Sequence, residues 1–133
     1  MSESVTFSYD FIASDTIALA KAKGTMQPAD IKRFYLGLVA FSCTKSTFLL
    51  LADFRESSMN FDAPTLLKLV EEVGVITSGY KIARIYPTTD FRQYIIEEYA
   101  VRLDVPIRNF ANEADAIEWL LDESENHLFF DTE

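Results

Sequence analysis

The side chains best suited to chemistry stand just after the most apolar run of the sequence. That run, FLLLA at positions 48–52, is unbroken and ends at Asp53. Such a run predicts a strand covered on both faces, and ligands of open α/β sheets bind where strands of this kind end. We therefore place a candidate binding or regulatory loop between Asp53 and Asp62. Its candidate residues carry a charge or a hydrogen-bonding group: Asp53, Arg55, Ser57, Ser58 and Asn60.

Each candidate also has an ordinary structural role. Asp53 could bind a cation or act as a base, but carboxylates at strand ends commonly bond nearby backbone N–H groups. We therefore favour a loop cap, or an ion pair with Arg55 or Arg84. Ser57 and Ser58 precede a predicted helix whose N-terminus would favour a phosphate on either hydroxyl. Serine is equally common in turns that have no such role.

The residues needed for covalent catalysis do not come together in the sequence. A catalytic nucleophile requires a base beside it and a group that orients this base. The sole histidine, His127, stands in the acidic end of the chain, and the sole cysteine, Cys43, closes an apolar helix and is expected to be a buried, inert thiol. Glycine-rich phosphate loops and paired metal ligands are missing as well. We predict a protein that is not an enzyme and holds no cofactor or metal.

The net charge of −9 is unevenly distributed. Residues 109–133 hold eight acidic and no basic side chains, so they account for −8 of it. An acidic end repels nucleic acid and anionic membrane surfaces, so neither is an expected partner. A solvated acidic helix and tail is a simpler explanation than a basic partner. We divide the chain into a domain over residues 1–122 and an acidic tail over 123–133.

The location of the protein is predicted from three further features. No apolar run approaches the roughly 20 residues of a membrane helix, so no membrane span is expected. The first residues lack the basic region of a signal peptide. A single cysteine forms no internal disulfide, which is typical of the reducing cytoplasm.

Apolar periodicity predicts one α/β domain with nine elements in the order β-β-α-β-α-β-α-β-α. A three-residue break joins the first two strands as an antiparallel hairpin, and a helix follows each of the last four strands. Strands that alternate with helices form a largely parallel sheet. We therefore predict a single mixed, mostly parallel sheet of about five strands with four helices and the hairpin at its edge. The predicted strands are 5–12, 16–24, 46–54, 80–86 and 106–110.

The helices have predicted caps and predicted buried faces. Asp62 and Asn112 are expected to cap the second and fourth helices, and Thr88 or Thr89 the third. Because the last helix is too short to be stable alone, it must dock on the sheet, and we predict that Trp119 is largely buried. The predicted apolar faces are Ile31, Phe34, Tyr35, Leu38 and Phe41; Leu66, Leu69, Val70 and Val73; Phe91, Ile95, Tyr99 and Leu103; and Ala116, Ile117, Leu120 and Leu121.

The element order and four segments resemble the STAS/SpoIIAA-like group of small bacterial α/β proteins. The segments are GTMQPAD at 24–30, FLLLADF at 48–54, KIARIYP at 81–87 and IRNFANEADAIEWLL at 107–121. In the last of these, Ala116, Trp119 and Leu120 match the closing pattern A-x-x-W-L. The resemblance covers residues 5–121 and implies the SpoIIAA-like fold.

What the resemblance implies about function is a non-catalytic protein-binding or regulatory module. Well-understood members of the group are anti-sigma factor antagonists, which bind a kinase-like protein and are switched off by phosphorylation of a serine after a central strand. Ser57 and Ser58 stand at the matching place, in RESSMNFD, where the antagonists have a D-S-S/T-G-L pattern with a glycine. A protein partner is therefore expected.

The many aromatic residues leave an alternative open. Core packing explains most of them. The remainder could line a pocket for a small apolar, lipid-like ligand, which makes a carrier the alternative function, or they could form the contact of a homodimer.

Overall fold

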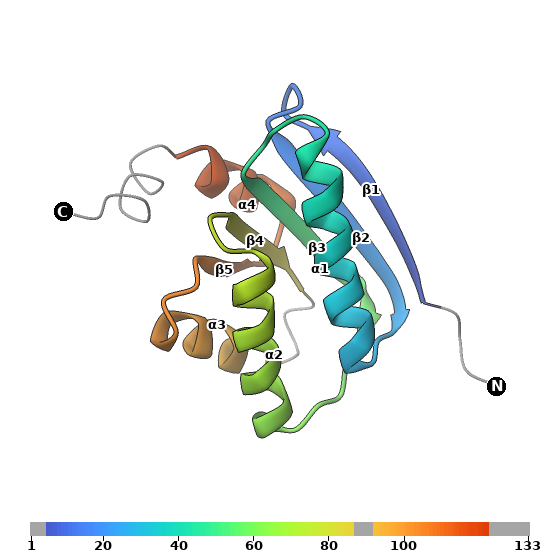
Figure 1. Cartoon of the computed structure of the whole chain (residues 1–133), viewed down its shortest axis with the longest axis vertical. Coiled ribbons are helices and arrows are strands. Elements are labelled where there is room, and N and C mark those ends of the chain that lie inside the picture. The colour runs from blue at the N-terminus through green and yellow to red at the C-terminus, as the bar shows by residue number, and fades with distance from the viewer. Residues whose placement is uncertain (1–4, 87–91, 123–133) are drawn as a thin grey trace.

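A five-stranded sheet forms the centre of the protein. The computed structural model describes residues 5–86 and 92–122. The sheet has the order β1-β2-β3-β4-β5, in which β1 is antiparallel to β2 and the other neighbours are parallel (Figure 1). The strands are β1 (Thr6–Ile12), β2 (Ile17–Thr25), β3 (Leu49–Ser58), β4 (Lys81–Ile85) and β5 (Ile107–Phe110). The predicted order and the parallel arrangement of β3, β4 and β5 are confirmed.

Four helices cover the two faces of the sheet unequally. The helices in the described residues are α1 (Pro28–Cys43), α2 (Ala63–Ile76), α3 (Arg92–Arg102) and α4 (Glu113–Leu121). Figure 1 shows α1, α2 and α3 on the face toward the viewer and α4 behind the sheet. Alternate residues of the central strand therefore enter different cores: Leu50 and Ala52 pack in the larger core, and Leu51 packs in the core under α4. The continuous apolar run of β3 follows directly from this double cover.

The hairpin strand β1 is half-exposed, as its alternating sequence predicts. Phe7, Tyr9 and Phe11 pack toward α1, and the Phe11 ring stacks on Phe41 with 4.3 Å between centroids. Three consecutive residues of the turn after β1, Ala13–Asp15, have positive φ angles of 53°, 56° and 65°. The Thr16 N–H closes this turn by donating to the Ala13 carbonyl at 3.2 Å.

Side chains cap the starts of the helices where the sequence predicts. The carboxylate of Asp62 accepts a hydrogen bond from the Thr65 N–H at 2.9 Å, and the amide oxygen of Asn112 accepts one from the Asp115 N–H at 2.9 Å. Such caps satisfy backbone donors that have no partner within the helix. The predicted cap of the third helix, Thr88 or Thr89, lies outside the described residues.

The buried helix faces agree with the prediction in α1 and α2 and differ in α3 and α4. In α3 the buried residues are Gln93, Ile96 and Ala100, so the predicted stripe of Ile95, Tyr99 and Leu103 is rotated by about one residue. In α4 Ala116 and Leu120 are buried and Trp119 is 7% exposed, which confirms its predicted burial, whereas Leu121 is 44% exposed. Phe91 lies outside the described residues.

Cys43 corrects another expectation. Its side chain is exposed, although the sequence predicts a buried thiol. The apolar face of α1 continues from Leu38 to Ser42, whose hydroxyl is buried against Tyr80 at 3.2 Å. Cys43 is therefore one residue past the buried face, and its sulfur lies 3.7 Å from the Tyr80 hydroxyl at the protein surface.

The outer edge of β5 is closed by contacts within the chain. The Asn109 N–H donates to the Glu97 carboxylate of α3 at 2.9 Å, and the Ile107 N–H donates to the Val105 carbonyl at 2.8 Å. These two N–H groups alternate with those of Arg108 and Phe110, which face β4 in a parallel ladder. The outward donors of β5 are thus occupied.

Candidate functional site

The segment predicted as a loop after the central strand is largely strand. β3 continues through Ser58, beyond its last pairing with β4, which joins Asp53 to Ile85. Of the strands in residues 5–86 and 92–122, only β2 pairs with the extension, with Glu56 opposite Lys23 and Ser58 opposite Thr25. We name residues 54–58 the β3 extension. The polar sequence RESS is tolerated in a strand here because the side chains of Arg55, Glu56 and Ser58 are exposed.

A bulge marks the start of the β3 extension. Lys21 pairs with Asp53 but Lys23 pairs with Glu56, so β3 has one residue more than β2 between these two pairs. An extra residue of this kind increases the local twist and turns the following side chains to a new direction. The Met26 N–H then donates to the Ser58 carbonyl at 2.8 Å, which ties the end of the extension to the entry of α1.

Asp53 and Arg55 form a two-point ion pair on the face of the sheet that α4 covers. Arg55 Nε donates to Asp53 Oδ1 at 3.0 Å, and an Arg55 terminal nitrogen donates to Asp53 Oδ2 at 2.7 Å. The Arg55 backbone N–H also donates to Oδ1, at 3.1 Å. Asp53 is buried and Arg55 is exposed, so the guanidinium shields the carboxylate from solvent. Of the two partners that the sequence leaves open for Asp53, the structure shows Arg55.

The charges around Asp53 keep it ionised. Burial alone raises the pKa of Asp53, but hydrogen bonds from Arg55 together with the positive charges of Arg55 and Lys21 outweigh this and hold the pKa below its ordinary value. The same bond raises the pKa of Arg55. The Glu113 carboxylate, in the first turn of α4, lies 3.7 Å from Arg55 and gives the guanidinium a second anionic neighbour. A carboxylate held in this way is a poor general base at neutral pH.

The two serines of the β3 extension differ in their surroundings. The Ser57 hydroxyl is half-buried and donates to the Phe54 carbonyl at 3.0 Å, so it is used within the strand. The Ser58 hydroxyl is exposed, 3.2 Å from the hydroxyl of Thr25 on β2. Asn60 is also exposed, two residues beyond the strand. The structure therefore brings Asp53 and Arg55 together and leaves Ser58 and Asn60 at the surface.

The described residues include no group of three His, Cys, Asp or Glu side chains placed to hold a metal ion. His127 lies outside the described residues, so the structure gives it no position near the β3 extension. Within residues 5–86 and 92–122, no helix is long and apolar enough to cross a membrane.

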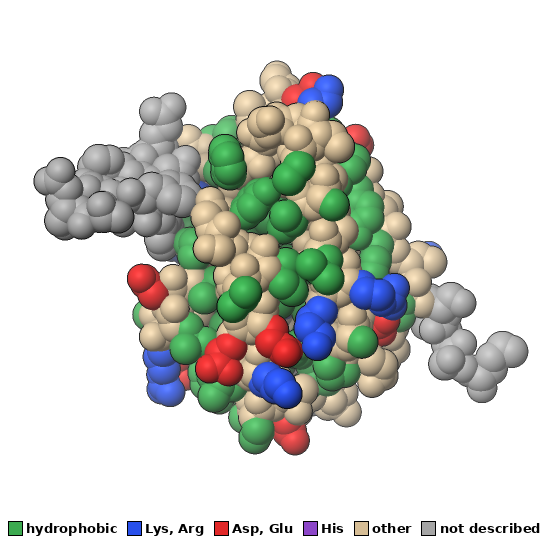
Figure 2. Space-filling model, in the orientation of Figure 1, with side chains coloured by type: hydrophobic (Ala, Val, Ile, Leu, Met, Phe, Trp, Pro, Cys, Tyr) green, Lys and Arg blue, Asp and Glu red, His purple; other side chains and the backbone are tan. Residues whose placement is uncertain are grey.

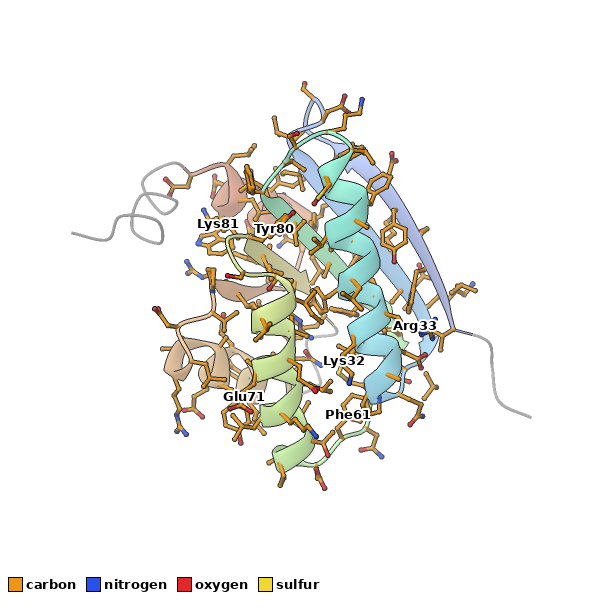
Figure 3. The ribbon with its side chains drawn as sticks, viewed as in Figure 1. Lys32, Arg33, Phe61, Glu71, Tyr80 and Lys81 are labelled. Carbon is orange, nitrogen blue, oxygen red and sulfur yellow. The ribbon has the colours of Figure 1, made fainter. Side chains whose placement is uncertain are left out.

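Sequence reasoning missed two buried cations of β4. The Lys81 side chain is fully buried on the α4 side, and Arg84, on the opposite face, is 3% exposed. Figure 3 shows Lys81 next to Tyr80, where β4 begins. Their signal in the sequence is a cation flanked by apolar residues in a strand that is covered on both faces. Such a cation must find its partners inside the protein.

The surface over α1 and α2 is divided into an apolar and a charged region. Figure 2 shows hydrophobic side chains gathered over the upper part of the two helices, with charged side chains below. Leu36 and Val75 are exposed residues of α1 and α2. In the charged region Lys32 bridges to Glu72 of α2 at 3.6 Å, and Arg33 points to the other side of α1, over the Phe7 ring (Figure 3).

Comparison with known proteins identifies the fold. No protein-family model matches the sequence, and no curated protein is similar to it. Among solved structures, an uncharacterized protein of the DUF3478 family from Shewanella loihica, described as having a SpoIIAA-like fold, is similar with a TM-score of 0.57 and 19% identity, over 90% of this chain and 98% of that one. The chain has a SpoIIAA-like fold. The fold expected from the sequence is confirmed.

A second solved structure has the same fold and a known type of activity. It is an anti-sigma factor antagonist from Mycobacterium paratuberculosis, with a TM-score of 0.53 and 20% identity, over 92% of this chain and all of that one. Both matches extend over nearly the whole of each chain. At this identity the likeness establishes the fold.

Proposed function

We propose that this protein is a non-catalytic regulatory module that binds a protein partner through the β3 extension and the residues beside it. The proposal depends on the position of the extension, which continues past β4 and, among the described strands, pairs with β2 alone. Strand segments with an open side are common docking places for other chains. The similarity to an anti-sigma factor antagonist supports a regulatory role for the module.

Four features of the β3 extension suit a protein contact. Arg55, Glu56 and Ser58 are exposed side chains of three chemical types within four positions. The backbone beneath them is fixed by the pairing with β2 and by the Asp53–Arg55 ion pair, so little order is lost on binding. Charged groups of the partner that pair with Arg55 or Glu56 would make the contact specific for that partner and sensitive to salt. Asn60 extends the same polar surface toward the start of α2.

Ser58 is the residue through which phosphorylation would regulate this contact. Its hydroxyl is exposed and lies beside another hydroxyl, that of Thr25, so a phosphate can be accommodated without disrupting the core. Lys23, two residues before Thr25 on the same strand, supplies a positive charge nearby, whereas Glu56 supplies a negative one. Ser57 suits this role less because its hydroxyl is already bonded within the strand.

The experiment is site-specific photocrosslinking in a lysate of the source cell. One protein carries a photoreactive residue at Ser58, and the control carries it at Ser78, an exposed serine in the turn before β4, at the opposite end of the sheet. We expect one protein to be captured from Ser58 and not from Ser78. Its affinity for the purified chain should then fall at least tenfold for Ser58→Asp and be unchanged for Ser78→Asp. Capture from Ser78 alone, or equal affinity of both variants, would place the contact elsewhere.

The cavity beneath α2 gives the carrier alternative little support. The apolar cavity beneath α2 has a volume of about 30 Å³. One water molecule needs about 10–15 Å³ by the same measure, so this space does not accommodate an acyl chain without movement of α2.

A further inference from the structure

A largely apolar groove lies between α3 and the edge strand β5 (Figure 1). Its volume is about 620 Å³, which is within the range of sites that hold a small molecule or a few side chains. Tyr94 and Val101 of α3 line it and are 72% and 74% exposed, although both are large hydrophobic side chains. Val105 and Pro106, just before β5, line it as well. The described residues therefore leave a hydrophobic surface open here.

A second groove continues from the first along α4. It has a volume of about 580 Å³, and Phe110 of β5 is one of its walls. Arg108 and Trp119 line both grooves, so they form the junction between them. The Arg108 guanidinium lies 5.7 Å from the centre of the Phe110 ring and 6.0 Å from that of Trp119. Asp122, the last described residue, also lines the second groove, so the chain leaves the described domain at this place.

The sequence that follows Asp122 contains a hydrophobic cluster among acids. Residues 123–133 lie outside the described residues and read ESENHLFFDTE. Leu128, Phe129 and Phe130 are consecutive, and acidic residues stand on both sides of them. Single hydrophobic residues are normal at a protein surface, but a contiguous group of large ones indicates a contact. The acids of this segment suit solvent, whereas its hydrophobic cluster requires a partner surface.

The position of this cluster in the chain favours the groove as that surface. Leu128 is six residues after Asp122, and six extended residues span up to about 20 Å. Because Asp122 lines the same groove as Arg108 and Trp119, the junction to the first groove is within this reach. A segment joined to its site by so short a linker has an effective concentration on the order of millimolar. Weak hydrophobic contacts are then sufficient to hold it.

The charges of the groove are compatible with an acidic segment. Glu97 and Glu98 line it, but the Glu97 carboxylate accepts a backbone N–H of β5 and the Glu98 carboxylate lies 3.8 Å from Arg102. Asp104, at the far end of α3, is an exposed acid of the lining. Arg108 supplies a positive charge at the junction, nearer to Asp122. Acids that flank the hydrophobic cluster are therefore favoured at the junction.

We propose that Leu128, Phe129 and Phe130 dock in the groove between α3 and β5 of the same chain, with the neighbouring acids beside Arg108. The chain then occupies its own groove, and another chain that binds there must displace this segment. The site is separate from the proposed partner contact, since none of residues 54–58 lines the groove. Failure of this proposal therefore leaves the proposed function unaffected.

Intramolecular photocrosslinking of the full chain tests the docking directly. A photoreactive phenylalanine analogue replaces Phe129, and mass spectrometry identifies the crosslinked peptides of the monomer. We expect crosslinks to side chains of the groove such as Tyr94, Val101 and Pro106. Crosslinks confined to the exposed hydrophobic residues of α1 and α2, crosslinks between two chains alone, or no crosslink to the groove would overturn the proposal.

Two exposed valines provide a matched pair of variants for this experiment. Val101→Glu places a charge in the groove and should lower the yield of the groove crosslink by about fivefold, because a charge is costly against an apolar contact. Val75→Glu makes the same change on α2, at a residue that is 79% exposed and does not line this groove. It should leave the yield unchanged. Circular dichroism checks that both variants fold. Equal yields in the two variants would contradict the assignment.

Trp119 gives a second readout that needs no crosslink. It is the sole tryptophan, so its indole N–H gives a single signal in the NMR spectrum of the full chain. Replacing both Phe129 and Phe130 with serine should shift this signal, because Trp119 lines the groove. Thr132→Ala, a change near the same place in the sequence, is the control and should leave the signal where it is. An indole signal that does not move in the double variant would refute docking beside Trp119.

Discussion

The ammonium group of Lys81, on β4, lies 4.3 Å from the ring centre of Trp119, on α4, and donates to the backbone carbonyl of the same residue at 2.6 Å. It also lies 3.5 Å from the Leu120 carbonyl and 3.3 Å from that of Asp122. These carbonyls lie at the C-terminal end of α4, where the Asp122 N–H also donates to the Trp119 carbonyl, at 3.2 Å. A cation at this end is also favoured by the helix dipole. Lys81 thus joins the end of α4 to the sheet.

Replacing Lys81 with methionine should destabilise the protein while preserving the packing volume. The loss of a donor to buried carbonyls predicts a decrease of about 1–3 kcal/mol in the free energy of unfolding. Denaturant titration measures the decrease, and hydrogen exchange should show weaker protection in α4 than in α1. Lys68→Met, at an exposed position of α2, is the control and should change stability little. Equal stability of the two variants would contradict the role of Lys81.

Trp119 should be the most important side chain of α4 for stability. It fills the core between α4 and β5, with its ring centre 5.6 Å from that of Phe110. We expect Trp119→Ala to cost about 3–5 kcal/mol, the range for deleting a core aromatic residue. Leu121→Ala, two positions on and 44% exposed, should cost far less and serves as the control. Both values come from chemical denaturation.

The acidic tail should matter less than Trp119. A chain that ends at Asp122 keeps the Asp122 carbonyl that Lys81 contacts and lacks residues 123–133. Its melting temperature should remain close to that of the full chain. If this truncated chain unfolds easily while Trp119→Ala is stable, the two segments have the opposite importance. The division into a domain and a tail stays a prediction because residues 123–133 lie outside the described residues.

The lowered pKa of Asp53 predicts how the free energy of unfolding depends on pH. Its pKa is lower in the folded protein than in the unfolded chain, so the folded state favours the ionised form. Above the pKa of the unfolded chain, about 3.9, the full stabilisation is present. It decreases as the pH falls below that value, and it is lost once the pH has fallen below the lower pKa of Asp53 in the folded protein. Asp53→Asn should therefore be less stable than the unaltered protein at neutral pH, by about 1 kcal/mol because Arg55 is solvent-exposed. The difference should shrink in acid.

Urea unfolding at a series of pH values measures this difference. Glu56→Gln is the matched control, because Glu56 lies on the same strand with an exposed side chain. A stability difference for Asp53→Asn that grows as the pH falls would mean that the carboxylate is held in its neutral form.

The two serines of the β3 extension should respond differently to substitution. Ser58→Asp should leave the free energy of unfolding within about 0.5 kcal/mol of the original, because its side chain is exposed. Ser57→Asp removes the hydrogen bond to the Phe54 carbonyl from a half-buried position and should cost about 1–2 kcal/mol. Thermal melts of both variants decide this. A destabilised Ser58→Asp protein would make any loss of partner binding uninformative.

The fold could be predicted from the sequence because its signals are local and repeated. The unbroken run at 48–52 required cover on both faces, and Asp62 and Asn112 fixed the starts of two helices. The β3 extension could not be predicted in this way. Its polar side chains are typical of a loop, and what makes it a strand is its pairing with Lys23 and Thr25, more than thirty residues away.

Contacts between residues far apart in the sequence also explain why the buried face of α3 was wrong and why the buried cations of β4 were missed. Periodicity assigns Gln93 to the solvent, but its amide oxygen accepts a hydrogen bond from Arg84, so the helix turns this side toward the sheet. Arg84 in turn depends on Asn109 of β5, twenty-five positions later. A pattern of apolar residues contains no information about such a network. The Asp53–Arg55 pair, one of the two pairings that the sequence left open for Asp53, depends on no such network because its members stand two residues apart.

The closed edge of β5 has a consequence for self-association. Many sheet proteins form fibrils or continuous sheets when an edge strand offers free donors to a second copy. Here the Glu97 carboxylate and the Val105 carbonyl occupy the outward N–H groups of β5. A second copy that pairs with β5 would therefore have to displace one of these acceptors, whereas pairing with β1, at the other edge of the sheet, would place it beside the polar side chains Thr6, Ser8 and Asp10.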